Sequence, residues 1–270
     1  MEKNEQLIKS YLQRISNMLI INGGFLDSPG LYFGEMSLVL FFFQYARFTQ
    51  NELYTDYSFD LIEIIQSRIS YDTPIGYEHG LTGIGSAFEY LVQNGFIEAN
   101  TDETLEEFDK KIFSLNNLTY SPVEEILGIG YYALWKISGK SIWKNIIKQT
   151  VFPQILYFLE EKCKTDFFSF SLVSIIKDII YNNSMINEAS IILDRFQQPN
   201  KDKMNSIESK TYSILLEKIA KNENFDKNTF NLGIHDGLSG LGMSLLSNLD
   251  GNNSWLSLIP NDFFLIDFNL

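Results

Sequence analysis

Apolar residues recur every three or four positions along most of the chain, and sustained alternation of apolar and polar residues is scarce. This spacing places apolar side chains on one side of a helix, so the pattern predicts an all-α protein. The helices that we expect cover residues 3–21, 34–48, 51–69, 80–94, 101–115, 122–138, 141–160, 166–181, 184–197, 205–221 and 237–248.

Local signals predict several helix ends. Ser121-Pro122-Val123-Glu124 is typical of a helix start, with Ser121 at the N-cap and Pro122 at the first helical position. Asn94-Gly95 is typical of a helix end, because glycine adopts the left-handed backbone conformation at no steric cost.

Short glycine-rich segments open several of the most apolar helices. Gly34 and Gly80 are 46 residues apart, and Gly83 and Gly128 are 45 apart, which is the length of one helical hairpin with its loops. A weaker copy is expected at 168–171. Because glycine in a helix costs about 1 kcal/mol relative to alanine, we expect a close approach of backbones or of a ligand to offset that cost. The openings are Gly34-Glu35-Met36-Ser37-Leu38, Gly80-Leu81-Thr82-Gly83-Ile84-Gly85, Gly128-Ile129-Gly130 and Gly237-Leu238-Ser239-Gly240-Leu241-Gly242.

The hairpins divide into two layers. Helices that open with glycine are very apolar, whereas the helices that follow them, such as 101–115, carry a charged face. The first set is therefore expected to be inner and the second outer. Since no Pro- or Ser-rich linker interrupts the chain, we expect a single domain over residues 1–270.

The charge balance and the number of cysteines restrict the binding partners and the cellular compartment that we expect. The chain has 21 basic and 34 acidic residues, a net charge of −13, which disfavours nucleic acids and anionic membrane surfaces as partners. The single cysteine, Cys163, allows no internal disulfide, which fits a reducing compartment. The first residues are charged and precede no apolar signal segment, and the apolar run 38–43 is far shorter than the roughly 20 residues of a membrane span. We therefore expect a cytoplasmic protein.

Two of the glycine-rich openings extend into longer similar motifs, Glu78-His79-Gly80-Leu81-Thr82-Gly83-Ile84-Gly85 and His235-Asp236-Gly237-Leu238-Ser239-Gly240-Leu241-Gly242. Together with Leu31-Tyr32-Phe33-Gly34 they resemble the lanthionine synthetase C family, over about residues 30–250. The resemblance implies an α/α toroid of helical hairpins, smaller here than a full family member, with the active site where the glycine-rich helix starts converge. We expect residues 3–21 to pack beside 237–248 and close the ring.

The chain departs from the family at its metal site. Cyclases of this family use zinc, held by two Cys and one His, to bind the cysteine thiolate that adds to a dehydrated Ser or Thr of a precursor peptide. This chain has Ile234-His235-Asp236-Gly237 where the family has Cys-His-Gly, and Cys163 matches no ligand motif. We therefore expect neither metal nor other cofactor, and well below one zinc per chain. A three-ligand zinc site of His79, His235 and a carboxylate stays open as an alternative.

The candidate catalytic residues are His79 and Asp236. His79 matches the His-Gly-Leu-x-Gly opening, and its ordinary pKa near 6.5 suits proton transfer. The alternative role for His79 is N-capping or loop hydrogen bonding, and Asp236 is also a natural N-cap. Acidic residues near helix starts are also favoured by the helix dipole. We expect His79, Glu78, Glu125 and Asp236 to surround one cavity. The expected substrate-binding residues flank the glycine-rich openings: Glu35, Glu78, Glu125, His235 and Tyr77.

Three functions agree with these patterns. The first is a lanthionine synthetase C-like protein that binds or modifies a ribosomal precursor peptide without zinc cyclase activity. The second is a non-catalytic interaction module that joins a precursor peptide or a peptide-modifying enzyme in a maturation complex. The third is a glycosidase-like enzyme that uses one carboxylic acid and one carboxylate.

Overall fold

The computed structural model describes residues 2–113, 121–162, 172–173, 176–177, 179–181, 211–221 and 231–259. All regular elements in these ranges are helical, which confirms the all-α prediction, and none of the described helices is long and apolar enough to cross a membrane. The predicted helix 184–197, most of 166–181, the weak repeat at 168–171 and Cys163 lie outside the described residues.

The described residues fall into two compact units. The first comprises 2–73, 211–221 and 231–253, and the second comprises 74–113, 121–162, the short pieces between 172 and 181, and 254–259. The single domain and the toroid remain predictions.

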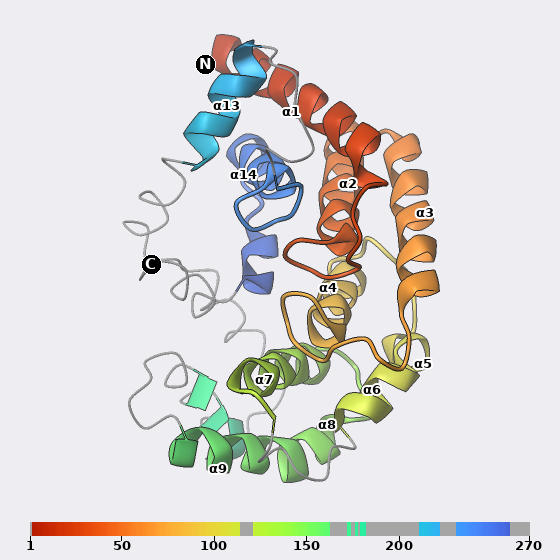
Figure 1. The fold of residues 1–270 in the computed structure, drawn as a ribbon, viewed down its shortest axis with the longest axis vertical. Coiled ribbons are helices and arrows are strands. Elements are labelled where there is room, and N and C mark those ends of the chain that lie inside the picture. The colour runs from red at the N-terminus through yellow and green to blue at the C-terminus, as the bar shows by residue number, and fades with distance from the viewer. Residues whose placement is uncertain are drawn as a thin grey trace. The chain divides into compact units, whose positions relative to one another are not determined.

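The first unit is built around two buried helices, α2 (Glu35–Thr49) and α14 (Leu238–Asp250). Helix α2 forms a hairpin with α3 (Glu52–Arg68), and α14 packs against both α2 and α1 (Glu2–Gly23) (Figure 1). Helix α13 (Thr211–Lys221) covers α1. The predicted packing of residues 3–21 beside 237–248 is therefore confirmed, whereas the closure of a ring stays a prediction.

The second unit pairs α4 (Leu81–Gln93) with α7 (Val123–Ser138) (Figure 1). Helix α4 also packs against α6 and a short 3₁₀ turn, and α7 also packs against α9. The predicted helix 101–115 is divided at Leu105, and the predicted helix 141–160 is three consecutive elements. The remaining elements are α5 (Thr101–Thr104), α6 (Glu106–Phe113), α8 (Lys144–Ile146), the π-helical turn η2 (Ile147–Val151), α9 (Phe152–Lys162) and the 3₁₀ turn η3 (Ser254–Leu258).

The helices that open with glycine form the core of each unit. In α4 every residue from Leu81 to Leu91 is buried, whereas α3 buries only Ser58, Leu61 and Ile65. A Cβ added at Gly85 of α4 would lie 2.6 Å from the ring of Tyr132, and one added at Gly242 of α14 would lie 2.4 Å from the ring of Phe41. The glycines therefore let aromatic rings pack directly on the helix backbone, which offsets their low helix propensity.

The predicted cap of α7 is wrong by one residue. Pro122, not Ser121, is the N-cap, and its carbonyl accepts hydrogen bonds from the N–H groups of Glu125 and Ile126. The φ of Pro122 is −56° and its ψ is extended at 151°, so this residue lies just outside the helix. The predicted end of α4 is confirmed: Gly95 has a φ of 66°, and its N–H donates to Val92.

The residues before α2, α4 and α14 fold into the same loop. In each loop the first helical N–H donates to the carbonyl of the residue six positions before the N-cap glycine. These groups have no partner within a helix, so the loop supplies one. The hydrogen bonds run from Glu35 to Ser28, from Leu81 to Pro74 and from Leu238 to Asn231, with N–O distances of 2.9, 2.8 and 3.0 Å.

These N-cap positions require glycine because there is no room for a Cβ atom. Gly34, Gly80 and Gly237 have ordinary extended backbones, with φ between −119° and −128°. A Cβ at Gly80, however, would lie 2.2 Å from the carbonyl oxygen of Pro74 and 2.6 Å from that of Gly76. The two other N-cap glycines meet equivalent carbonyls at 2.3 to 2.7 Å. A second glycine stands four residues earlier in every copy, so the loop has the form Gly-x-x-x-Gly.

We predict that Gly80→Ala lowers the free energy of unfolding by about 1–3 kcal/mol, because backbone atoms must move to admit the methyl group. Gly76→Ala in the same loop is the matched control, since no atom lies within 4 Å of a Cβ there. We expect the control to change stability by about 0.5 kcal/mol or less. Urea unfolding of both variants measures the difference, and equal losses would show that the loop does not need a glycine at its N-cap.

Candidate functional site

The shared loop aligns the candidate residues of both units. His79 and Asp236 occupy the same position, directly before the N-cap glycine, where the first loop has Phe33. His235 is one residue earlier and is therefore equivalent to Glu78 rather than to His79.

His235 lies in an aromatic corner of the first unit. Its ring stacks on Tyr32 with 5.7 Å between ring centroids and an interplanar angle of 4°, and Phe33 meets it edge-on at 5.6 Å. The N–H of Ile234 donates to the carbonyl of Tyr32 (2.9 Å), so the first and last glycine loops are in contact. Because His235 is only 4% exposed, its ring is held rigidly and offers a ligand little surface.

Asp236 extends this corner to the surface. Its side chain is 43% exposed, and its Oδ2 lies 3.5 Å from Nδ1 of His235. Its φ is 51°, and among the described non-glycine residues only Gln50, at the end of α2, shares a positive φ. Asp tolerates this conformation better than most residues, yet such strain is concentrated at functional positions. The alternative role of Asp236 as an N-cap is wrong, since Gly237 is the N-cap of α14.

His79 and Glu78 form an exposed pair in the second unit. Their side chains are 56% and 38% exposed, and Nε2 of His79 lies 3.8 Å from a carboxylate oxygen of Glu78. The N-cap of α4 is Gly80, so the alternative capping role of His79 is wrong as well. Glu125 is half-buried in the first turn of α7.

Tyr77 and Glu35 lie in the cores of their units. Tyr77 is 1% exposed and donates to the carbonyl of Leu258 at 3.1 Å, and burial raises the pKa of its hydroxyl well above the ordinary value. Glu35 is also 1% exposed, and its Oε1 lies 2.9 Å from Nη1 of Arg68. Burial raises the pKa of Glu35 to about 6, although the Arg68 guanidinium opposes the shift.

The single cavity that we expect from the sequence would have to be lined by residues of both units. His79, Glu78 and Glu125 belong to the second unit and Asp236 to the first, and the shared cavity therefore stays a prediction. What the structure does bring together is His235 with Asp236 and Tyr32, and separately Glu78 with His79.

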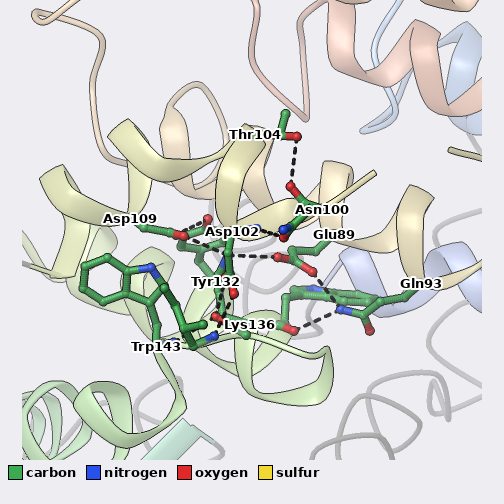
Figure 2. A network of polar contacts seen from close by, with 12 residues as sticks. Glu89, Gln93, Asn100, Asp102, Thr104, Asp109, Tyr132, Lys136 and Trp143 are labelled. Carbon is green, nitrogen blue, oxygen red and sulfur yellow. Dashed lines mark hydrogen bonds and ion pairs between the residues drawn. The ribbon is translucent and has the colours of Figure 1, made fainter. Parts of the chain in front are cut away.

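The sequence patterns did not indicate a buried ionic network in the second unit. Lys136 of α7 is fully buried, and Figure 2 shows three carboxylates from α4, α5 and α6 around its ammonium group. Nζ lies 3.2 Å from Glu89, 2.9 Å from Asp102 and 2.8 Å from Asp109. A lysine within the otherwise apolar run 126–137 was the signal available in the sequence.

Further donors support the carboxylates of this network. Tyr132 donates its hydroxyl to Asp109 at 2.6 Å, and Gln93 donates its amide to Glu89 at 3.0 Å (Figure 2). One cation faces three carboxylates, so two negative charges are uncompensated when all three carboxylates are ionised. Burial accordingly raises the pKa of Asp109 to about 6, even though hydrogen bonds from Lys136 and Tyr132 oppose the shift.

The raised pKa of Asp109 predicts a pH dependence of stability. Folded Asp109 binds its proton more tightly than the unfolded chain, so its contribution to stability is full below the ordinary pKa of 3.8 and is lost as the pH rises through about 6. Asp109→Asn removes this titration. Relative to the wild type, we expect the variant to gain on the order of 2–3 kcal/mol of unfolding free energy between pH 3.5 and pH 7.5.

Urea unfolding at several pH values measures this difference, with Asp60→Asn on the exposed face of α3 as the control. An Asp109→Asn variant whose stability follows the pH in parallel with the wild type would contradict the assignment.

Comparisons with protein-family models, curated protein sequences and solved structures found no match to this chain. Among the residues that the structure describes, no three His, Cys, Asp or Glu side chains are grouped so that they could hold a metal ion. The family resemblance therefore rests on the glycine-rich sequence motifs alone.

Proposed function

We propose that this chain is a divergent lanthionine synthetase C-like scaffold that binds a ribosomally made precursor peptide without the zinc chemistry of the family. The observation that carries the proposal is the His235–Asp236 pair on the third glycine loop. There the loop keeps the hydrogen bond from the first helical N–H that its two other copies make, but it holds Asp236 in a left-handed conformation with its side chain partly at the surface.

The repetition of the loop supports the scaffold. The glycine motifs that carry the family resemblance are the ones that form this loop before α2, α4 and α14. Each loop leads into a helix buried along most of its length. In the proposed toroid, the three loops would lie at one end of the inner ring.

Recognition of the peptide would rely on side chains. The first N–H groups of α4 and α14 already donate to loop carbonyls, so they are not available to an acidic group of a ligand. Asp236 offers an exposed acceptor for a peptide N–H or a basic side chain, and His79 offers an exposed imidazole. His235, which stacks on Tyr32, lies beside the carboxylate of Asp236.

The proposal assigns binding rather than zinc-dependent ring closure. In the family, zinc holds the thiolate that attacks the dehydrated residue, and a Cys directly before the His supplies one ligand. Ile234 stands at that place here, and an isoleucine side chain has no atom that binds zinc.

The test immobilises the chain of residues 1–270 and selects its ligands from displayed random peptides that contain Cys, Ser and Thr. The strongest peptide is then resynthesised with a fluorophore, and its affinity is measured for the wild type, Asp236→Asn and the control Asp56→Asn. Asp56 is exposed on α3 of the same unit. We expect Asp236→Asn to weaken binding by about tenfold, because it removes the charge of the acceptor, and to leave the thermal midpoint within about 2 °C.

Each result decides one part of the proposal. Failure to enrich any peptide would overturn peptide binding, and equal affinity of Asp236→Asn and Asp56→Asn would remove Asp236 from the site. The selected peptide is also prepared with dehydroalanine at a Ser position. If the chain closes its thioether ring only when zinc is added, the assignment of binding without zinc chemistry is wrong.

A further inference from the structure

The buried network around Lys136 attaches two short helices to the core of the second unit. Helix α5 has four residues and α6 has eight, whereas an isolated helix shorter than about 12 residues is marginal in water. The positions of α5 and α6 therefore depend on their contacts with other elements. Each contributes one carboxylate to the network, Asp102 from α5 and Asp109 from α6, and Lys136 lies on the buried helix α7 (Figure 2).

Asp109 is central to the attachment of α6. Only three residues of this helix are buried: Asp109, Ile112 and Phe113. The Oδ1 atom of Asp109 accepts a hydrogen bond from the hydroxyl of Tyr132 at 2.6 Å, and its Oδ2 atom lies 2.8 Å from Nζ of Lys136. Phe113 stacks on the ring of Tyr132 with 5.6 Å between centroids. Two of the three buried side chains of α6 therefore hold it on α7.

Asp102 extends the network to the residues that follow α7. Its Oδ1 atom lies 2.9 Å from Nζ of Lys136 and accepts a hydrogen bond from the hydroxyl of Ser141 at 2.6 Å. Its Oδ2 atom accepts a hydrogen bond from the N–H of Ile142 at 2.7 Å. One carboxylate thus joins α5, α7 and the chain just after α7.

The charged groups around Asp109 come from three other described helices, as Glu89 of α4, Asp102 of α5 and Lys136 of α7. Tyr132 is neutral, because burial and the nearby carboxylates hold the pKa of its hydroxyl far above the ordinary value. Three exposed residues of α6 pair with one another: Glu106, Glu107 and Lys110. When all three buried carboxylates are ionised, the single lysine leaves the network with a net charge of −2. Release of a proton from Asp109 therefore increases the repulsion between α6 and its neighbours.

We propose that the Lys136 network is a proton-operated latch for α5, α6 and residues 141–142. With the proton bound, the network holds these parts on α7, and when the proton is released they open locally while α4 and α7 stay packed. Helices α4 and α7 do not depend on the latch, because every residue of 81–91 and of 126–137 is buried. The proposal does not depend on peptide binding at Asp236, which belongs to the other unit.

The direction of the pH dependence follows from Asp109. Burial raises the pKa of Asp109 to about 6 in the closed state, whereas an opened α6 would expose this carboxyl to water, where its ordinary pKa is 3.8. The closed state binds the proton more tightly, so this contribution to closing is full below pH 3.8 and is lost as the pH rises through about 6. From pH 5 to pH 7.5 the equilibrium constant for opening should rise by about tenfold.

Amide hydrogen exchange, followed by mass spectrometry on the chain of residues 1–270 between pH 5 and pH 7.5, measures this opening. After correction for the exchange rate of an unstructured peptide at each pH, we expect the protection of α6 and of the Ile142 amide to fall by about tenfold. Protection in α4 and α7 should change by less than about twofold. Asp109→Asn removes the titrating group, so its α6 should show no pH dependence, and the control Asp60→Asn on α3 should behave as the wild type does.

Tyr132→Phe gives a second readout that a merely structural network would not give. The variant keeps the ring that stacks on Phe113 but lacks the hydroxyl that donates to ionised Asp109. The ionised form is then less stable, so the midpoint of the transition in α6 should move to higher pH. Protection of α6 that does not depend on pH in the wild type, an equal loss of protection in α4 and α7, or an unshifted midpoint in Tyr132→Phe would overturn the proposal. So would an Asp109→Asn variant that keeps the pH dependence.

Discussion

The starts of α2, α4 and α14 depend on a carbonyl group that approaches the N-cap residue too closely for any side chain. The hydrogen bond from Leu81 to Pro74 closes the loop before α4, and the same bond recurs before α2 and α14. The first N–H groups of a helix have no hydrogen-bond partner within the helix, and burying them without a partner is costly. A loop whose carbonyls accept from these groups therefore lets the helix begin inside the core. The glycine at the N-cap follows from this geometry and not from a need for unusual backbone angles.

This constraint also determines where a ligand can be recognised. A helix start that is closed by its own loop offers no free backbone donors, so anion binding by the helix dipole is not the chemistry of these loops. The variable positions are the two residues before the N-cap glycine. They hold Tyr32 and Phe33 in the first copy, Glu78 and His79 in the second, and His235 and Asp236 in the third. The same loop thus carries three different pairs of side chains: an aromatic pair, an exposed ionic pair and a partly buried ionic pair.

The network at Lys136 joins the core of the second unit to its surface. Buried ion pairs are expensive to desolvate. Replacing a whole buried pair with apolar residues of similar volume therefore often leaves the stability unchanged or raises it. Asp102, however, both pairs with Lys136 and accepts hydrogen bonds from Ser141 and Ile142, so the network positions the residues that follow α7 as well as the helices.

Helix positions could be predicted from the sequence because most helices bury one apolar face, and the pairing of α1 with α14 followed from the expected order of the repeats. The Gly-x-x-x-Gly loop was not predicted, because its first glycine stands four residues before the N-cap glycine and therefore lies outside the motifs that begin at Leu31, Glu78 and His235. The contacts of Lys136 could not be predicted. They join residues 27 to 47 positions away on other helices, and the register between helices is set by packing rather than by local pattern.

Amide hydrogen exchange at the first residues of α4 and α14 tests most directly whether the loops close these helix starts. In an ordinary helix, the first N–H groups lack a helical partner and exchange first. Because Leu81, Thr82, Leu238 and Ser239 donate to loop carbonyls, we predict that they exchange as slowly as amides in the middle of the same helices. Rapid exchange at these four amides, with slow exchange further along each helix, would contradict the account.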